Sequence, residues 1–335
     1  MNHLTTAKEK YQSLLMEKQN VVGVGIGFKT VKQRRTDQLS IVVLVEKKLP
    51  IEALNAEDVV QAELDGIPTD VQEIGTVRAL NIEPNEKTRT GKWRPAPGGV
   101  SIGHHRITAG TLGTLVFDRR TGERLILSNN HVLANCNDAE PKDPILQPGP
   151  YDGGQNNDKI AELFQFVPVR FLVDDPTCGL TMRTTQVANT FLETIGSSHR
   201  FRSVRINNQE NTVDAAVALP LKPELVDDEI LDIGTVEGTK EAELGMTVQK
   251  SGRTTGCTAG TIDVIDTTVR VLYSYDRVAV FTHQLVSNLK SQGGDSGSVL
   301  VSDSKAVGLL FAGSENSSIC NPIGLVLDPL DVRIQ

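Results

Sequence analysis

A short run near the C-terminal end of the chain combines residue types that can form a nucleophilic turn. Residues 293–298 read Gly-Gly-Asp-Ser-Gly-Ser. Glycines permit the strained backbone angles of such a turn and let a substrate carbonyl approach the main chain closely. Ser296 is then the candidate nucleophile, and the N–H groups of Gly294 and Ser296 are a candidate oxyanion hole. Because plain surface turns have similar sequences, the hypothesis needs partners elsewhere in the chain.

Two other segments supply these partners. His131 follows an apolar stretch at 125–127 that predicts a strand, and Asp214 enters another small apolar strand. A serine hydroxyl is a poor nucleophile at neutral pH, so His131 would take its proton and return it to the leaving amine. Asp214 would hold the imidazole in the useful tautomer and stabilise its cation. Taken singly, His131 is an ordinary packed or surface histidine and Asp214 a strand cap, so their order along the chain matters.

The order His131, Asp214, Ser296 is that of the chymotrypsin-like proteases and differs from that of subtilisins and α/β-hydrolases. With these motifs, residues 98–335 resemble a trypsin/chymotrypsin-like serine protease. Residues 248–262, which include Ser-Gly-Arg-Thr-Thr-Gly, are similar to the strand that opens the second barrel of bacterial members such as α-lytic protease. Residues 94–103 and 147–154 are similar to bacterial relatives of the plant narrow-leaf trypsin-like protein.

This resemblance implies a serine endopeptidase that hydrolyses peptide bonds through an acyl-enzyme, with peptides or proteins as substrates. The alternative is a catalytically silent or conditionally active scaffold of the same fold that binds protein partners. Exchange of Ser296 for alanine would separate the two functions.

The resemblance also implies a counter-ion for Asp295, the acid beside the nucleophile. In digestive relatives this acid pairs with an amino terminus freed by cleavage, but residues 98–110 lack the usual Ile-Val-Gly-Gly. In α-lytic protease a basic side chain near the Ser-Gly-Arg-Thr-Thr-Gly strand has this role, so we expect Lys250, or failing that Arg253, to pair with Asp295. An unpaired buried carboxylate would be costly.

Substrate-binding residues follow from the same resemblance. Phe311, Ala312 and Gly313 end a predicted strand, 306–313, that is similar to the strand pairing with substrate main chain. Gly324 is expected to form the opposite wall of a pocket. Lys290 stands where trypsin-like enzymes place an aspartate, so a preference for basic substrates is not expected. Lys290 either favours an acidic substrate residue or is an ordinary solvated lysine.

The expected fold is mostly β, with two six-stranded antiparallel barrels of chymotrypsin type. The first barrel covers about 98–220, the second about 245–335, and an acidic connector joins them. An insertion at 172–212 contains apolar residues at helical spacing, which predicts a helix packed on the first barrel. Strand patterns fall at 112–118, 124–129, 159–169, 213–218, 246–250, 260–265, 268–273, 277–283, 298–302, 306–312 and 323–327.

A separate small α+β domain is expected at 1–84, followed by a polar, proline-bearing linker at 85–97. Its pattern predicts helices at 5–19 and 51–62 and strands at 21–28, 39–45 and 67–77. Its role is open between assisting folding, covering the cleft and mediating assembly into a homo-oligomer.

Composition limits the function classes. The chain of 335 residues is 39% hydrophobic, enough for a core, and its net charge of −8 argues against a nucleic-acid surface. No apolar run is long enough to cross a membrane, and the N-terminus lacks the pattern of a secretory signal. The four widely spaced cysteines, together with that missing signal, favour a cytoplasmic protein with reduced thiols.

Metal and cofactor signals are poor. His104 and His105 are adjacent, so on a strand they would point to opposite faces and are expected to be structural or solvent-facing. The loop at 135–140 has oxygen ligands but lacks the pattern of a dedicated calcium loop. We expect neither a metal site nor a cofactor.

Overall fold

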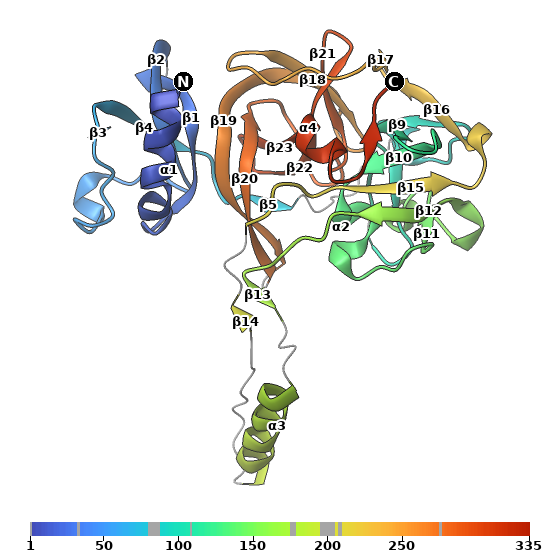
Figure 1. Ribbon diagram of the computed structural model, residues 1–335, viewed down its shortest axis with the longest axis horizontal. Helices are drawn as coiled ribbons and strands as arrows, with labels where there is room; N and C mark the ends of the chain where they lie inside the picture. The colour runs from blue at the N-terminus through green and yellow to red at the C-terminus, as the bar shows by residue number, and fades with distance from the viewer. Residues whose placement is uncertain are drawn as a thin grey trace.

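The structure, a computed structural model, describes residues 2–31, 34–79, 88–107, 109–174, 179–194, 205–206, 210–274 and 277–335. The predicted mostly-β fold class is confirmed. Two β halves lie side by side in Figure 1, the N-terminal strands flank one of them, and a helix lies on a narrow β stalk away from both. No helix in these ranges is long and apolar enough to cross a membrane.

The half that carries Ser296 is a sheet of six antiparallel strands that closes on itself. The order is β18-β21-β22-β23-β20-β19, and β18 also pairs with β19. One long strand, β19, replaces the two strands expected at 260–265 and 268–273. The strands are β18 (Thr247–Gly252), β19 (Gly256–Ser274), β20 (Arg277–Ser287), β21 (Val299–Ser302), β22 (Lys305–Gly313) and β23 (Ser318–Pro322).

The other half has the strand order β24-β9-β10-β15-β12-β11-β7-β8. Only two residues separate β8 from β9, so the path returns close to its start. Strand β24 comes from the C-terminal end of the chain and pairs with β9, which differs from the expectation that 245–335 forms only the second barrel. The strands are β7 (Ser101–His104), β8 (Gly110–Thr111), β9 (Thr114–Asp118), β10 (Arg124–Ser128), β11 (Pro144–Leu146), β12 (Lys159–Phe166), β15 (Ala216–Pro220) and β24 (Val332–Arg333).

The N-terminal strands continue the sheet of the Ser296 half. Strand β1 runs antiparallel to β19, with Gly23 opposite Val269 and Gly27 opposite Val264, and β2, β4 and β3 follow outward. A Cβ on Gly25 would lie 2.6 Å from Val264 Cγ1, so glycine lets the two strands approach. The elements are α1 (Asn2–Met16), β1 (Val21–Val31), β2 (Arg34–Val45), β3 (Glu63–Leu64), β4 (Ile67–Glu73) and β5 (Arg78–Ala79).

The prediction of a helix at 51–62 is wrong. Only a 3₁₀ turn, η1 (Ile51–Ala53), forms there. Ile51 is 70% exposed and the turn buries no residue, so no apolar packing of the turn itself supports its extension into a helix.

Part of the predicted linker is built into the protein body. Arg89 in η2 (Thr88–Thr90) is buried and donates hydrogen bonds to Gly99 O, Ser251 Oγ and Asp232. Strand β6 (Ala96–Gly98) pairs in parallel with β16 (Val226–Ile230), which in turn pairs with β17 (Gly234–Thr235). Linker residues 85–87 lie outside the described ranges.

The insertion contains the expected helix, but its predicted packing on the first barrel is wrong. Helix α3 (Gly179–Thr194) lies apart from both halves in Figure 1, beyond the two-stranded ribbon of β13 (Val173–Asp174) and β14 (Arg205–Ile206). Val187, one of the apolar residues at helical spacing in this insertion, is 70% exposed. The spacing of apolar residues predicts a helix, but it does not predict which surface the helix packs against.

The prediction of a strand at 323–327 is also wrong, because these residues form helix α4 (Ile323–Leu327). Ile323, Val326 and Leu327 are buried, which is the spacing of one helical face. The remaining elements are α2 (Asn130–Leu133) and the 3₁₀ turns η3 (Asn135–Asn137), η4 (Pro150–Asp152), η5 (Asn156–Asp158) and η6 (Pro223–Leu225).

Candidate active site

The structure brings His131 and Asp214 into direct contact. His131 lies in α2, which is separated from β10 by one residue. Its Nδ1 lies 2.7 Å from Asp214 Oδ2. The His131 backbone N–H donates to Oδ1 of the same carboxylate at 3.2 Å. Because Nδ1 faces a carboxylate, it carries the ring proton and leaves Nε2 as an acceptor. Nε2 is buried and has no hydrogen-bond partner among the described residues.

Asp214 is fully buried, and both halves hold its backbone. Asn129 Nδ2 donates to Asp214 O at 2.7 Å, and Asp214 N donates to Asn321 Oδ1 at 3.1 Å. Asn129 directly follows β10, in the half without Ser296, and Asn321 lies in β23 of the Ser296 half. The backbone that carries the Asp214 carboxylate is therefore fixed from both halves.

Ser296 lies in the turn before β21, close to α2. Thr111 N donates to Ser296 O at 2.8 Å, and a Cβ on Gly110 would overlap Val132 and lie 3.0 Å from Ser296 O. Gly110 therefore allows Val132, the residue after His131, to pack against the turn that carries Ser296.

The Ser296 hydroxyl does not hydrogen-bond to His131 in this structure. Ser296 Oγ donates to Phe311 O at 3.3 Å, while His131 Nε2 finds no partner in the described ranges. Catalytic hydrogen bonds are often long or unmade without substrate, and a change of the Ser296 rotamer would redirect Oγ.

The turn presents its amides and fixes its carbonyls. Gly293 O accepts from Thr254 Oγ1 at 2.6 Å, and Gly294 O accepts from Thr111 Oγ1 at 2.7 Å. Gly294 has φ of +94°, which glycine adopts readily. In the described part of the chain, the N–H groups of Gly294 and Ser296 donate to no protein acceptor, so both are available to an oxyanion.

Asp295 is completely buried and lies against Lys250, which is also buried. Lys250 Nζ lies 3.2 Å from Asp295 Oδ2, and the same oxygen accepts from Thr255 Oγ1 at 2.6 Å and from Gln292 N at 3.0 Å. Burial lowers the pKa of Lys250, and the charge of Asp295 opposes that shift. Oδ1 accepts from the backbone N–H of Thr254 at 2.8 Å.

Arg253, the second candidate counter-ion, pairs with a different acid. Its guanidinium makes two hydrogen bonds to the buried carboxylate of Asp152 in η4, with Nε 2.8 Å from Oδ2. Of the two basic residues, the structure therefore places Lys250 at Asp295 and uses Arg253 to join the two halves.

Tyr273 is a site residue that sequence reasoning missed. Its hydroxyl donates to Asp214 Oδ2 at 2.5 Å, and its ring meets the His131 ring edge-on with centroids 5.8 Å apart. Burial, followed by the nearby Asp214 charge, raises the pKa of Tyr273 well above its usual value, so the hydroxyl stays a donor. Nothing in the sequence marked this residue, because only the course of β19 brings it to Asp214.

The predicted substrate-binding residues divide into a buried group on β22 and an exposed group elsewhere. Phe311 and Ala312 are fully buried on β22, and Phe311 O contacts the Ser296 hydroxyl. Gly324 is exposed on α4, and a Cβ there would meet no atom within 4 Å. Lys290 is exposed, and its carbonyl accepts from Thr258 Oγ1 at 2.8 Å. No described hydrogen bond links Gly324 or Lys290 to Ser296, so their roles in specificity stay predictions.

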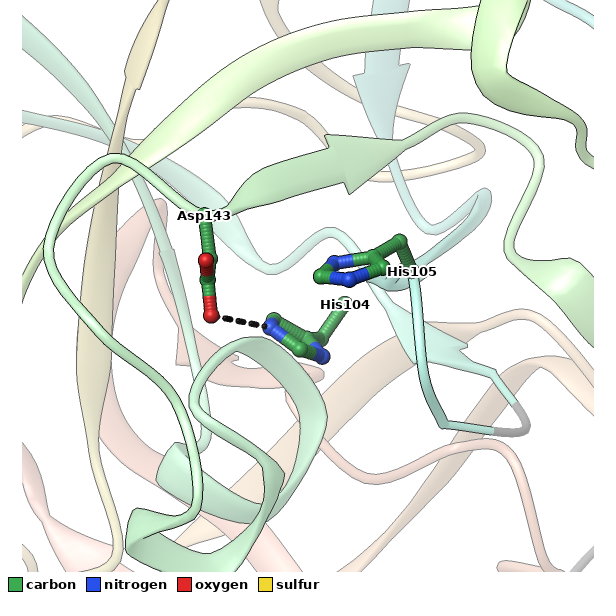
Figure 2. A group of neighbouring side chains, drawn as sticks. All are labelled: His104, His105 and Asp143. Atoms are coloured by element: carbon green, nitrogen blue, oxygen red, sulfur yellow. Dashed lines mark hydrogen bonds and ion pairs between the residues drawn. The ribbon is translucent and has the colours of Figure 1, made fainter.

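His104 and His105 gather with Asp143, as Figure 2 shows, with one ligand atom from each within 4.8 Å of the others. The expectation that the two imidazoles point to opposite faces is wrong, because β7 ends at His104 and His105 lies in the following turn. Their ring centroids are 4.3 Å apart.

The hydrogen bonds of His104 favour a structural role for this cluster. The backbone N–H of Arg106 donates to His104 Nδ1 at 3.2 Å, so Nε2 carries the proton and donates to Asp143 Oδ2 at 3.0 Å. A metal ion on Nε2 would require the proton on Nδ1, facing the Arg106 N–H. Burial lowers the pKa of His104, which agrees with a neutral ring.

Three cysteines fall in the described ranges, and none of them forms a disulfide there. Cys257 is exposed, whereas burial raises the pKa of Cys136 to about 12 and also raises that of Cys320. Cys178 lies outside the described residues. The cytoplasmic location stays a prediction.

No protein-family model matches the chain. Among curated proteins, it is 26% identical over 325 residues to Protein NARROW LEAF 1 of Oryza sativa subsp. japonica, which covers 88% of this chain and 51% of that protein. It is 35% identical over 81 residues to Serine protease 2 of Streptomyces fradiae, covering 24% of this chain and 44% of that protein. The chain thus spans about half the length of the curated relatives it matches.

Solved structures of bacterial proteases are also similar. Thermobifida fusca Protease A and Nocardiopsis protease are each 17% identical, cover 71% and 72% of this chain and 98% and 100% of their own, and give TM-scores of 0.45 and 0.46. Alpha-lytic protease homolog N4 is 14% identical, covers 72% of this chain and 99% of its own, and gives 0.45. The chain is similar to bacterial chymotrypsin-like serine proteases.

Proposed function

We propose that the protein is a serine endopeptidase that uses His131, Asp214 and Ser296. The observation that carries the proposal is the geometry of His131, whose Nδ1 is held by a buried carboxylate and whose Nε2 is an unpartnered acceptor. This is the arrangement of a general base that waits for a proton. The proposed substrates are peptides or proteins.

The proposed reaction has two stages. His131 Nε2 takes the Ser296 proton as Oγ attacks the substrate carbonyl, and the N–H groups of Gly294 and Ser296 bind the oxyanion. His131 then gives the proton to the leaving amine, and an acyl-enzyme remains. Water, activated by the same imidazole, releases the acid product and restores Ser296.

One observation favours the conditionally active alternative. Ser296 Oγ donates to Phe311 O and not to His131, so the structure corresponds to a resting arrangement. On this alternative the protein would bind peptide partners at the same cleft, and turnover would follow only after rearrangement of the serine.

Replacement of the nucleophile tests the proposal directly. We expect Ser296→Ala to abolish labelling by a fluorophosphonate and to lower peptide turnover by roughly 10⁶-fold, as loss of a serine nucleophile does elsewhere. Ser13→Ala, on the exposed face of α1, is the control and should behave as the unchanged protein. A fluorophosphonate that labels neither the unchanged protein nor the control, with no peptide turnover, would favour the silent scaffold.

A further inference from the structure

One edge of β22 carries the nucleophile turn. Strand β21 pairs along this edge only as far as Leu309. The turn continues along it, since Gly297 N donates to Leu310 O at 2.8 Å and Ser296 Oγ donates to Phe311 O at 3.3 Å. The opposite edge is covered by β23 from Gly308 to Gly313. An extended peptide that pairs with β22 and reaches Ser296 must therefore use the first edge, beyond Phe311.

That part of the edge is already occupied by the chain itself. Strand β5 pairs there in the antiparallel sense, with Arg78 opposite Gly313 and Ala79 opposite Ala312, and Figure 1 shows it beside β22. From Arg78 to Ala79 the main chain runs toward Phe311 and hence toward Ser296. A substrate paired in this direction would bring its following residues to the nucleophile.

Apolar packing holds β5 in this position. Arg78 also pairs in parallel with Leu272 of β19. The backbone N–H of Leu272 donates to Val77 O at 3.2 Å. Ile74 and Val77, just before β5, are 4% and 2% exposed and belong to the apolar cluster that contains Phe311. The pairing is thus part of a packed interface and not a chance approach of two strands.

We propose that β5 is an intramolecular occupant of the substrate edge, which a peptide substrate must displace before it can pair with Ala312 and Gly313. The inference rests on the proposed function, because it assigns regulation to the same site. Strand addition at an edge supplies main-chain hydrogen bonds to one strand at a time, so β5 and an extended peptide compete. The apparent affinity for peptides falls by the fraction of molecules in which the edge is open.

Proline at position 78 tests the competition. Arg78→Pro removes a main-chain N–H and disfavours strand pairing, whereas Arg78→Ala keeps the main chain and is the matched control. If the edge is open in about a tenth of the molecules, Arg78→Pro should raise kcat/KM for an extended peptide up to about tenfold. Labelling by a small fluorophosphonate, which needs Ser296 but no strand pairing, should stay unchanged in both variants.

The outcomes separate the inference from the proposed function. Unchanged peptide turnover in Arg78→Pro, with normal labelling, would overturn the inference and leave the endopeptidase in place. Equal activation by Arg78→Ala would also overturn it, because the effect would not depend on strand pairing. Absence of both labelling and turnover in every variant would overturn the proposed function and the competition with it.

A reversible tether guards against a proline variant that fails to fold. Ala79 and Ala312 are directly opposite, so the double variant Ala79→Cys/Ala312→Cys in a Cys257→Ser background places two thiols within reach of a disulfide. The oxidised form should label with fluorophosphonate but cleave the peptide at least about tenfold more slowly than the same sample after reduction. Equal cleavage by a fully crosslinked and a reduced sample would contradict the inference.

Discussion

Asp214 Oδ2 accepts from two groups, the His131 ring at 2.7 Å and the Tyr273 hydroxyl at 2.5 Å. Both bonds share one buried negative charge. The tyrosine donor weakens the pull of the carboxylate on the imidazole proton, and its ring also packs edge-on against the imidazole. On the proposed function, Tyr273 is therefore a positioning residue that acts on His131 through Asp214.

Tyr273→Phe should remove the donor and keep the ring. We expect kcat/KM to fall by about tenfold or more, since a hydrogen bond to a charged group contributes about 1.5–3 kcal/mol. Without the donor the carboxylate attracts the imidazole proton more strongly, so the acid limb of the pH profile of kcat/KM should move to higher pH. Steady-state kinetics at several pH values measure both effects.

Tyr151→Phe is the control, because Tyr151 is 41% exposed and its ring lies near Arg253 instead of Asp214. A Tyr273→Phe variant with reduced activity but an unmoved acid limb would indicate that Tyr273 acts only through packing.

Lys250 offers a second test at single residues. Lys250→Met should leave the Asp295 carboxylate buried without its counter-ion, and loss of one partner of a buried pair costs about 3–5 kcal/mol. The free energy of unfolding, measured in urea, should fall by that order. The adjacent amide of Ser296 should shift as well, so labelling of Ser296 should slow.

The double variant Lys250→Met/Asp295→Asn is the partner experiment, because it removes both charges. It should recover part of the lost stability. If the double variant is no more stable than Lys250→Met, the ion pair is not the reason for the loss.

Sequence reasoning could name residues whose neighbours along the chain explain them. Ser296 stands among glycines and His131 follows an apolar strand, so each has a local pattern. Tyr273 has none, because its role depends on β19 reaching Asp214 from a distant part of the chain. The choice between Lys250 and Arg253 also depended on a distant residue, since Asp152 takes Arg253.

At the scale of elements, the contact between β1 and β19 depends on glycine. A Cβ on Gly25 would lie 2.6 Å from both Val264 Cγ1 and Thr267 Oγ1. We expect Gly25→Val to lower the free energy of unfolding by about 1–3 kcal/mol, the usual range for overpacking. Urea unfolding, followed by far-UV circular dichroism, measures the change in the free energy of unfolding.

Gly324→Ala is the stability control for this substitution, because its Cβ would meet no atom within 4 Å and the residue lies in a helix. It should stabilise the protein slightly or leave it unchanged. A Gly25→Val variant as stable as the unchanged protein would show that the two strands can move apart at no cost.

The elements that sequence patterns misjudged were those with a purely local signal. Residues 323–327 are apolar in a way that fits a strand or a helix, and burial of Ile323, Val326 and Leu327 against the core selects the helix. Most strands of the two halves were predicted because their apolar runs are bounded by turns. Their pairing partners, and the addition of β1 to β19, depend on contacts between residues far apart in sequence.

At the scale of the whole molecule, the N-terminal strands and the Ser296 half share one apolar cluster. Val42 and Leu44 of β2 pack with Val264, Val271 and Phe281 of β19 and β20. The division into an N-terminal domain at 1–84 and a protease domain from 98 stays a prediction, but this shared cluster makes the two parts interdependent. A common core favours joint unfolding over independent domains.

A chain that begins at Gly98 should therefore be much less stable than the full chain. It would expose the edge of β19 and the apolar side chains that face Val42 and Leu44, and an exposed long edge strand promotes association. It would also lose the bonds of Arg89 to Gly99 O and Ser251 Oγ. Thermal unfolding should show a lower midpoint, and size-exclusion chromatography should show aggregates. A monomeric fragment with the midpoint of the full chain would show instead that residues 98–335 fold by themselves.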